Sequence, residues 1–363
     1  MTVPIRLLCV AGARPNFVKM APLFRAFAGT PRIAPMLVHT GQHHDDCMSG
    51  RFLRELALPA PRCNLGAGAG SQVQQIAMIM QRLEPVLMAE RPSAVLVVGD
   101  VNSTLAAALA AKKLGFFLIH AEAGLRSFDR SMPEELNRLI VDAISDLNLV
   151  SEESGMRNLQ AEGVPAEKVC LAGNLMIDCL LSHREEAKKS RIIDELGLRG
   201  RRFGVVTLHR PGNVDHDGQL GEMLRALREI SAELPLVFPV HPRTAAKLPE
   251  HACGPDIRVC APLGYLDFLC LMSNSAVVLT DSGGVQEETT VLGIPCLTLR
   301  NNTERPATLE QGTNRLAGRA YESILRAWRE RPGETRTPML PAVWDGHAAE
   351  RCVEAICSRL AGR

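Results

Sequence analysis

The segment from residue 277 to residue 288 has the composition of a phosphate-binding turn. An apolar run at 277–279 predicts a short buried strand, and Gln286, Glu287 and Glu288 open a predicted helix. Between them, Ser282–Gly284 would place unpaired N–H groups and the positive end of a helix dipole around an anion. A diphosphate could lie there, and Glu287 or Glu288, one turn into the helix, could accept hydrogen bonds from a ribose diol. A Gly-Gly pair alone favours an ordinary capped turn, so this interpretation depends on the rest of the chain.

Candidate acid–base and anion-binding residues occur in the first half of the chain. Asp100 and Glu122 follow the predicted strands 94–98 and 116–120, while Glu134 begins a predicted helix. Arg14 and Lys19 follow the predicted strand 5–10 and its glycine turn. Any one of these carboxylates could be a structural ion-pair partner. Three of them at predicted turns favour a shared catalytic function.

Strands alternate with helices along the whole chain, which predicts α/β domains with doubly wound, mostly parallel sheets. Binding groups should then collect at the carboxyl ends of the strands. The length of 363 residues favours two domains. We expect an N-terminal Rossmann-like domain at 1–175 and a second at 176–345, facing each other across a cleft. A terminal helix within 346–363 is expected to pack back on the first domain.

Composition excludes several functional classes. The net charge of +1 with no basic block argues against nucleic acid or an anionic membrane as a partner. No apolar run approaches the roughly 18 residues of a membrane span, and the N-terminus predicts no signal peptide. The 11 cysteines are scattered without a Cys-x-x-Cys pair, which predicts reduced thiols in the cytoplasm. Gly-x-Gly-x-x-Gly is absent, which disfavours a nicotinamide-dependent enzyme.

Several motifs together resemble those of the non-hydrolysing UDP-N-acetylglucosamine 2-epimerases, in order from about Leu7 to about Gly318. They are Gly12-Ala13-Arg14-Pro15, Gly99-Asp100, His120-Ala121-Glu122-Ala123-Gly124-Leu125-Arg126, Pro133-Glu134-Glu135-Leu136-Asn137-Arg138, His209-Arg210, Pro239-Val240-His241, Asp281-Ser282-Gly283-Gly284-Val285-Gln286-Glu287-Glu288 and Thr303-Glu304-Arg305-Pro306.

The resemblance implies a glycosyltransferase-B-like pair of domains, a cytoplasmic homodimer, and no metal or nicotinamide cofactor. It implies interconversion of UDP-GlcNAc and UDP-ManNAc, a reaction that supplies polysaccharide biosynthesis. It also assigns roles to individual residues. The implied catalytic residues are Asp100, Glu122, Glu134 and His209. The implied substrate-binding residues are Arg14, Lys19, Arg138, Ser282, Gly283, Gly284, Glu288 and Arg305.

The chemistry of such a reaction constrains the carboxylates. The proton on sugar C2 is barely acidic until the anomeric C–O bond to UDP breaks and an oxocarbenium ion develops. A carboxylate can then take the proton to give 2-acetamidoglucal, and UDP re-adds while a proton arrives from the opposite face. Because two groups on opposite faces need different protonation states, at least one should have a raised pKa. The sequence does not determine which carboxylate serves which face.

The same sequence features are compatible with four other functions. A hydrolysing 2-epimerase would release UDP and free ManNAc, and a related 2-epimerase could act on a 2,3-diacetamido uronic acid. A glycosyltransferase of the same fold would need an acceptor cleft, whereas clustered carboxylates favour proton transfer. A nucleotide-sugar sensor would bind without turnover.

The chain departs from the pattern by which several bacterial relatives bind a second, activating UDP-GlcNAc. Gln42 and His241 match that pattern, but the residue three places beyond Gln42 is the acidic Asp45. The loop at 64–71 has no arginine, and Pro211 follows His209-Arg210, where the pattern has an arginine. Two cations are lost and one anion is gained around a diphosphate. We therefore expect the activating site to be weak or absent.

Overall fold

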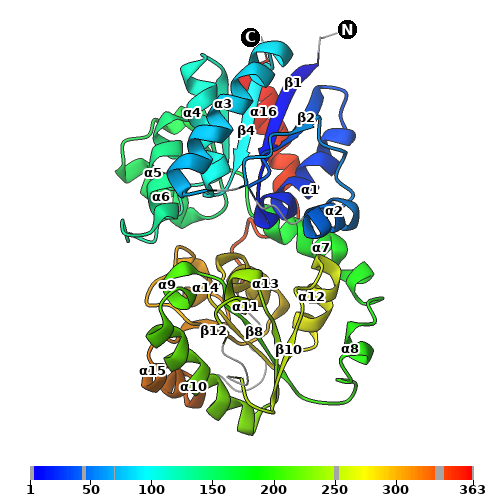
Figure 1. Cartoon of the computed structure of the whole chain (residues 1–363). Coiled ribbons are helices and arrows are strands. Elements are labelled where there is room, and N and C mark those ends of the chain that lie inside the picture. The colour runs from blue at the N-terminus through cyan, green and yellow to red at the C-terminus, as the bar shows by residue number, and fades with distance from the viewer. Residues whose placement is uncertain (1–3, 43–45, 69, 249–252, 332–338, 362–363) are drawn as a thin grey trace. The chain divides into compact units, whose positions relative to one another are not determined.

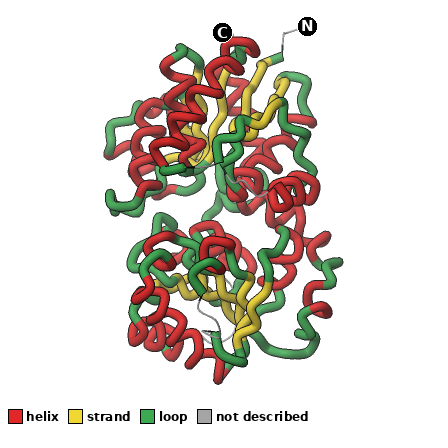
Figure 2. The backbone as a smooth tube through the Cα atoms, in the orientation of Figure 1, coloured by secondary structure: helices red, strands yellow, loops and turns green. Residues whose placement is uncertain are grey.

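The computed structural model describes residues 4–42, 46–68, 70–248, 253–331 and 339–361. The chain divides into two compact units (Figure 1). Unit 1 comprises residues 1–182 and 342–363, and unit 2 comprises residues 183–341. Each is built on a sheet of parallel strands enclosed by helices (Figure 2), so the predicted α/β class is confirmed.

Unit 1 contains a seven-stranded sheet in the order β3-β2-β1-β4-β5-β6-β7. Its strands are β1 (Ile5–Ala11), β2 (Ile33–His39), β3 (Cys63–Asn64), β4 (Ala94–Val98), β5 (Phe117–Ala123), β6 (Leu147–Val150) and β7 (Val169–Leu171). Its helices are α1 (Arg14–Ala28), α2 (Asp46–Glu55), α3 (Gln72–Glu90), α4 (Asn102–Lys113), α5 (Pro133–Ile144), α6 (Glu153–Ala161), the short 3-10 helix η1 (Ala166–Lys168), α7 (Leu175–Ala187), which runs on into unit 2, and α16 (Ala348–Leu360).

Unit 2 contains a six-stranded sheet in the order β10-β9-β8-β11-β12-β13. Its strands are β8 (Gly204–Thr207), β9 (Leu236–Pro239), β10 (Ile257–Cys260), β11 (Val277–Thr280), β12 (Cys296–Thr298) and β13 (Asn314–Leu316). Its helices are α8 (Ile192–Glu195), α9 (Pro211–Val214), α10 (Asp217–Glu233), α11 (Pro242–Ala245), α12 (Tyr265–Ser273), α13 (Gly283–Leu292), α14 (Pro306–Glu310) and α15 (Tyr321–Arg329).

The central strands of unit 1 are buried on both faces, which explains their unbroken apolar sequences. Leu8 and Val10 of β1, together with Val95 and Val97 of β4, belong to the core formed with α3 and α4. Since successive side chains of a strand point to opposite faces, the residues between them face the other layer. Helices α1 and α16 pack against each other in unit 1 (Figure 1). This doubly covered sheet brings the carboxyl ends of β1, β4 and β5 to one edge.

Candidate active site

In unit 2, β11 ends in a tight turn that leads directly into α13. Ser282 occupies the N-cap position without a side-chain capping bond, and its N–H donates to the Thr280 hydroxyl at 3.0 Å. A Cβ at Gly283 would lie 2.5 Å from Glu304 Oε1, so the turn needs a glycine there. Without a side-chain cap, the first N–H groups of α13 can receive a phosphate group.

Asp281 lies fully buried at this turn and fixes the imidazole of His209. It accepts the N–H groups of His209 at 3.0 Å and Arg210 at 2.9 Å, and its Oδ1 lies 3.0 Å from His209 Nδ1. Burial by itself would raise the pKa of Asp281, but His209 and these backbone donors hold the pKa at about 2. Because the carboxylate accepts from Nδ1, Nε2 is the ring nitrogen that can meet a ligand.

Glu288 is a buried carboxyl whose Oε1 accepts a hydrogen bond from the hydroxyl of Tyr265 at 3.1 Å. Burial raises the pKa of Glu288 to about 7, against a smaller opposing effect of Tyr265. Hydroxyl groups of a ligand that donated to this carboxylate would stabilise its charged form. No local sequence pattern distinguished Tyr265 as a site residue, because it contacts a carboxyl 23 residues away in the chain.

The loop between β12 and α14 is held by a buried cluster of charges. Glu304 bonds Arg300 at 2.6 Å and Arg210 at 3.2 Å. Burial would raise the pKa of Glu304, but Arg210, Arg300 and Arg305 hold it well below the ordinary value. Arg305 is only 4% exposed, and its Nε lies 3.0 Å from Glu287 Oε1. The structure thus places Arg305, expected to bind substrate, within this charge cluster.

In unit 1, the turn from β1 into α1 is tied to the neighbouring strand. Asn16 Oδ1 accepts the N–H groups of Gly12 and the following residue at 3.1 and 3.0 Å, while its amide donates to the Val98 carbonyl at 2.9 Å. The guanidinium of Arg14 lies 4.3 Å from the centre of the Phe52 ring. Burial lowers the pKa of Arg14 to about 10, so the side chain stays charged at neutral pH.

Glu122 and Asp100 come together at the ends of two adjacent strands. β4 pairs with β5, and a register irregularity at the end of β5 leaves Glu122 with a φ of +67°. Such irregularities re-aim a side chain, and here Glu122 forms a buried ion pair with Lys19 of α1. A Cβ at Gly99 would lie 3.2 Å from Glu122 Oε2. The turn that carries Asp100 therefore passes directly beside Glu122.

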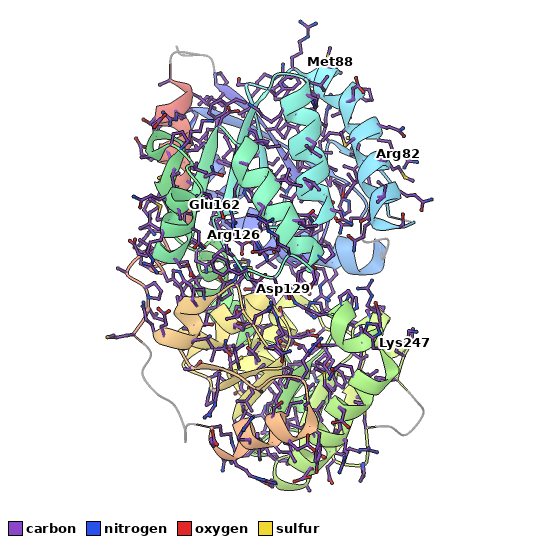
Figure 3. All side chains as sticks on the ribbon, turned by 90° about the vertical axis from the view of Figure 1, so that its left-hand side faces the viewer. Arg82, Met88, Arg126, Asp129, Glu162 and Lys247 are labelled. Carbon is purple, nitrogen blue, oxygen red and sulfur yellow. The ribbon has the colours of Figure 1, made fainter. Side chains whose placement is uncertain are left out.

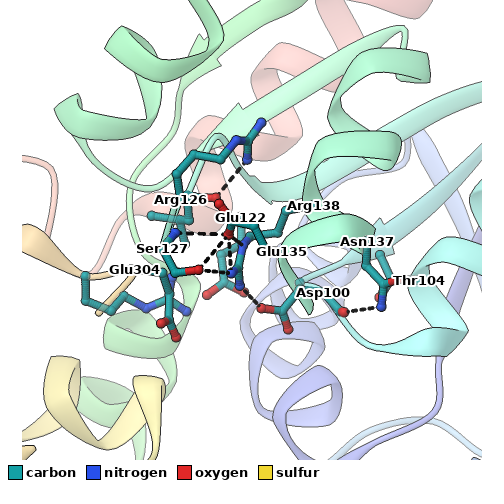
Figure 4. A network of polar contacts seen from close by, with 12 residues as sticks. Asp100, Thr104, Glu122, Arg126, Ser127, Glu135, Asn137, Arg138 and Glu304 are labelled. Carbon is teal, nitrogen blue, oxygen red and sulfur yellow. Dashed lines mark hydrogen bonds and ion pairs between the residues drawn. The ribbon is translucent and has the colours of Figure 1, made fainter. Parts of the chain in front are cut away.

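Helix α5 fixes the position of Asp100. Arg138, buried on α5, forms ion pairs with Asp100 and Glu135, and Asn137 donates to the Asp100 carbonyl at 2.7 Å (Figure 4). Glu135 is buried and accepts the Ser127 N–H at 3.0 Å. Glu134, the predicted acid–base residue, lies beside it on the first turn and is partly exposed. Of the two adjacent glutamates, Glu134 is thus the one that can meet a ligand.

The described residues lack two kinds of feature. None of their helices is long and apolar enough to cross a membrane. No group of three or more His, Cys, Asp or Glu residues in this part of the chain is arranged to hold a metal ion.

Comparisons with known proteins identify the family. Residues 25–357 match the family model described as UDP-N-acetylglucosamine 2-epimerase. The UDP-N-acetylglucosamine 2-epimerase of Methanocaldococcus jannaschii is 38% identical over 340 residues, covering 89% of this chain and 91% of the relative. The chain belongs to the UDP-N-acetylglucosamine 2-epimerase family.

Solved structures agree with the UDP-N-acetylglucosamine 2-epimerase assignment. The crystal structure of the M. jannaschii enzyme in complex with UDP-GlcNAc and UDP has a TM-score of 0.92 at 37% identity, over 98% of this chain and 100% of that one. A second relative has a different named substrate. The UDP-2,3-diacetamido-2,3-dideoxy-D-glucuronate 2-epimerase of Pseudomonas aeruginosa is 37% identical, over 96% of this chain and 99% of the relative.

Several supporting residues of this 2-epimerase site were not assigned from the sequence. Glu135 and Asn137 stand inside motifs that were recognised, and Asn16 directly follows one, but only the structure shows what they contact. Asp142 lies outside all of those motifs. Its one signal was its spacing from Glu135 and Arg138, seven and four residues earlier, which puts the three charged residues on one face of the helix.

Proposed function

We propose that the protein is a non-hydrolysing 2-epimerase that interconverts UDP-GlcNAc and UDP-ManNAc without a metal or nicotinamide. The observation that carries this proposal is the placement of Asp100 and Glu122 at the ends of adjacent strands, each in an ion pair with a buried cation, Arg138 and Lys19. Two carboxylates in such an arrangement suit proton removal and delivery at one carbon.

The proposed reaction begins with cleavage of the anomeric C–O bond, whose electron pair leaves with UDP. A carboxylate from the set Asp100, Glu122 and Glu134 takes the C2 proton, which gives 2-acetamidoglucal. UDP then adds back to C1 while another group of the set delivers a proton to the opposite face of C2. In this proposal Arg14 and His209 stabilise the departing diphosphate.

The two units would have different roles. Unit 2 would hold UDP through Ser282–Gly284 at the uncapped start of α13 and through Glu288, whose carboxylate would accept hydrogen bonds from the ribose diol. Arg305 would support this loop through Glu287 and Glu304. Unit 1 would supply the acid–base groups.

The diacetamido uronate is the alternative substrate for this chain. The Pseudomonas aeruginosa relative, named for UDP-2,3-diacetamido-2,3-dideoxy-D-glucuronate, is about as similar to this chain as the M. jannaschii enzyme. A 3-acetamido group and a C6 carboxylate would both need partners around the sugar. That carboxylate would need a cation, whereas Arg138 and Lys19 are already ion-paired with Asp100 and Glu122, which favours the neutral sugar of UDP-GlcNAc.

Proton NMR of the protein with UDP-GlcNAc in D₂O tests the function, with the diacetamido uronate as the parallel substrate. Appearance of UDP-ManNAc with deuterium at C2 supports the proposal. Turnover of the uronate alone would show that the uronate, and not UDP-GlcNAc, is the substrate. Accumulation of free UDP would indicate hydrolysis. Unchanged spectra of both compounds would refute catalysis.

A homodimer is also proposed, supported by exposed apolar side chains on unit 1. Leu136 and Ile140 of α5 are 46% and 39% exposed, and Val73 of α3 is 76% exposed. Helices α3 and α5 both pack on α4, so these side chains can form one surface for a second copy. Light scattering should report a dimer for the native protein and a monomer for Leu136→Glu with Ile140→Glu.

A cytoplasmic location is proposed as well. None of the ten cysteines whose side chains the structure describes forms a disulfide, and most of them are buried. This pattern is typical of proteins from a reducing compartment.

A further inference from the structure

His120 lies at the centre of the sheet of unit 1, and both of its ring nitrogens face hydrogen-bond acceptors. Its side chain is fully buried in β5. Nε2 lies 2.9 Å from the Gly99 carbonyl oxygen, and Nδ1 lies 2.6 Å from Asp142 Oδ1. A carbonyl oxygen can only accept a hydrogen bond, so Nε2 carries a proton. Nδ1 must donate as well if Asp142 is ionised.

The surroundings of Asp142 favour its ionised form. Its Oδ2 accepts the Gly124 N–H at 3.0 Å and lies 2.7 Å from Arg126 Nη1, and both of these groups are donors. Arg126 also bonds Glu162, at 2.7 and 2.6 Å (Figure 3). With His120 charged, the network contains two cations and two anions, and it is neutral overall. Glu162 is 33% exposed, so solvent also screens its charge. A neutral His120 with its proton on Nε2 would point the lone pair of Nδ1 at the ionised Asp142 across 2.6 Å, which is unfavourable.

The pKa of Asp142 depends on the same neighbours, His120 and Arg126, and is consistent with this charge state. Burial alone would raise the pKa of Asp142, but His120 and Arg126 hold it below its ordinary value. A carboxylate that stays ionised beside Nδ1 requires a proton on that nitrogen.

The two hydrogen bonds of this pair end on the two turns that carry the proposed acid–base residues. The Gly99 carbonyl directly precedes Asp100, and Gly99 has a φ of +67°. Gly124 stands two residues after Glu122, whose own φ of +67° is rarely adopted by a residue with a side chain. Such a conformation persists only where the surrounding structure holds it. Here the N–H of Gly99 also donates to the Ala121 carbonyl at 3.0 Å, which joins the two turns.

We propose that His120 carries a proton on each ring nitrogen and that, together with Asp142, it positions Asp100 and Glu122 for proton transfer. Neither residue of the pair bonds these two carboxylates directly. Each acts on the backbone beside one of them. His120 and Asp142 are therefore positioning residues and not catalytic residues. The inference rests on the proposed function for its effect on turnover, but the charge of His120 can be measured without any substrate.

The first experiment is nitrogen-15 NMR of the unaltered protein with labelled histidine at pH 8, where ordinary histidines are neutral. We expect one imidazole with protons on both nitrogens, both of which resist exchange with D₂O, and its loss in His120→Gln. A spectrum in which every buried imidazole carries a single proton would overturn the proposal, whether or not the variants fold.

The second experiment compares the turnover of His120→Gln and Asp142→Asn with that of a matched control. Asp146→Asn is suitable because Asp146 accepts the Leu118 N–H at 2.8 Å, at the opposite end of β5. We expect kcat for UDP-GlcNAc to fall at least tenfold in the first two variants, with KM and UDP affinity within about twofold of the native values. The control should keep its kcat although it also loses a partly buried ion pair, the one with Lys112.

Three results distinguish failure of this inference from failure of the proposed function. Native-like kcat in His120→Gln and Asp142→Asn would refute the positioning role while the native enzyme still epimerises. An equal loss of kcat in Asp146→Asn would show that general destabilisation is responsible. A native protein inactive on UDP-GlcNAc would refute the function, and the NMR result would still decide the charge of His120.

Discussion

Glu288 makes UDP binding dependent on pH in a way that can be calculated from the structure. Its pKa of about 7 in the free protein results from burial, so the carboxyl is largely protonated at pH 6 and largely ionised at pH 8. A ribose diol that donates two hydrogen bonds requires the ionised form. Binding at low pH must therefore release a proton from Glu288.

The size of the effect follows from this pKa. If binding lowers the pKa below about 5, UDP affinity should increase about tenfold between pH 6 and pH 8, because one pKa unit corresponds to about 1.4 kcal/mol. Glu288→Gln should remove this increase, and at pH 8 it should weaken binding by roughly 1–3 kcal/mol through the lost charge-assisted hydrogen bond. Since the phosphates of UDP also titrate, the difference between native protein and variant isolates the contribution of Glu288.

The same substitution should affect stability in the opposite direction. A carboxyl whose pKa is raised on folding contributes stability below its unfolded pKa of about 4.5, and this contribution is lost as pH rises through about 7. The loss amounts to about 3 kcal/mol at pH 8. Glutamine resembles the protonated acid, so Glu288→Gln should raise the denaturant midpoint at pH 8 and change it little at pH 5.

Titration calorimetry with UDP and denaturant unfolding at pH 5, 6 and 8 measure both effects. The reasoning would be refuted if the variant kept the tenfold pH dependence of the native protein, or if its affinity for UDP at pH 8 were unchanged. A variant less stable than the native protein at pH 8 would show that Glu288 is not a buried charge in the free protein.

Two further predictions concern turnover. Neutralising each proposed acid–base residue should lower kcat by about 10²-fold or more with UDP affinity nearly unchanged, and native-like turnover of one variant would remove that residue from the set. These substitutions are Asp100→Asn, Glu122→Gln and Glu134→Gln. The activating site for a second UDP-GlcNAc should be weak or absent, because Pro211 offers no donor and Gln42 Oε1 already accepts from Ser103. Kinetics with UDP-GlcNAc should therefore be hyperbolic, and UDP-ManNAc should react without added UDP-GlcNAc. Asp45 lies outside the described residues, so this prediction is tested by the saturation curve alone, and a sigmoidal curve would contradict it.

The main strands and turns of both units could be predicted because their sequences are locally unambiguous. The apolar run 94–98 became β4, and the strand, glycine turn and helix around Ser282 became β11 and α13. The edge strand β7 was predicted, but the edge strands β3, β10 and β13 were missed. β10 and β13 are short and contain charged residues, such as Arg258 and Arg315, because an edge strand buries fewer of its side chains.

The sequence by itself determined which types of side chain stand at the candidate site. Motif spacing placed Asp100, Glu122 and Ser282 at strand ends, since parallel strands between helices bring their carboxyl ends to one edge. Local pattern also predicted a helix that Gln286, Glu287 and Glu288 open, and the structure begins this helix three residues earlier, at Gly283.

Only the tertiary structure decided which charges face each other and which are buried. Glu134 and Glu135 are adjacent and identical in type, but burial against Arg138 makes Glu135 a structural anchor. Likewise, Glu288 acquires a pKa of about 7 from burial, whereas Asp281, equally buried, has a pKa of about 2 because donors surround it. Desolvation and pairing depend on neighbours that are distant in sequence, and therefore no local pattern contains them.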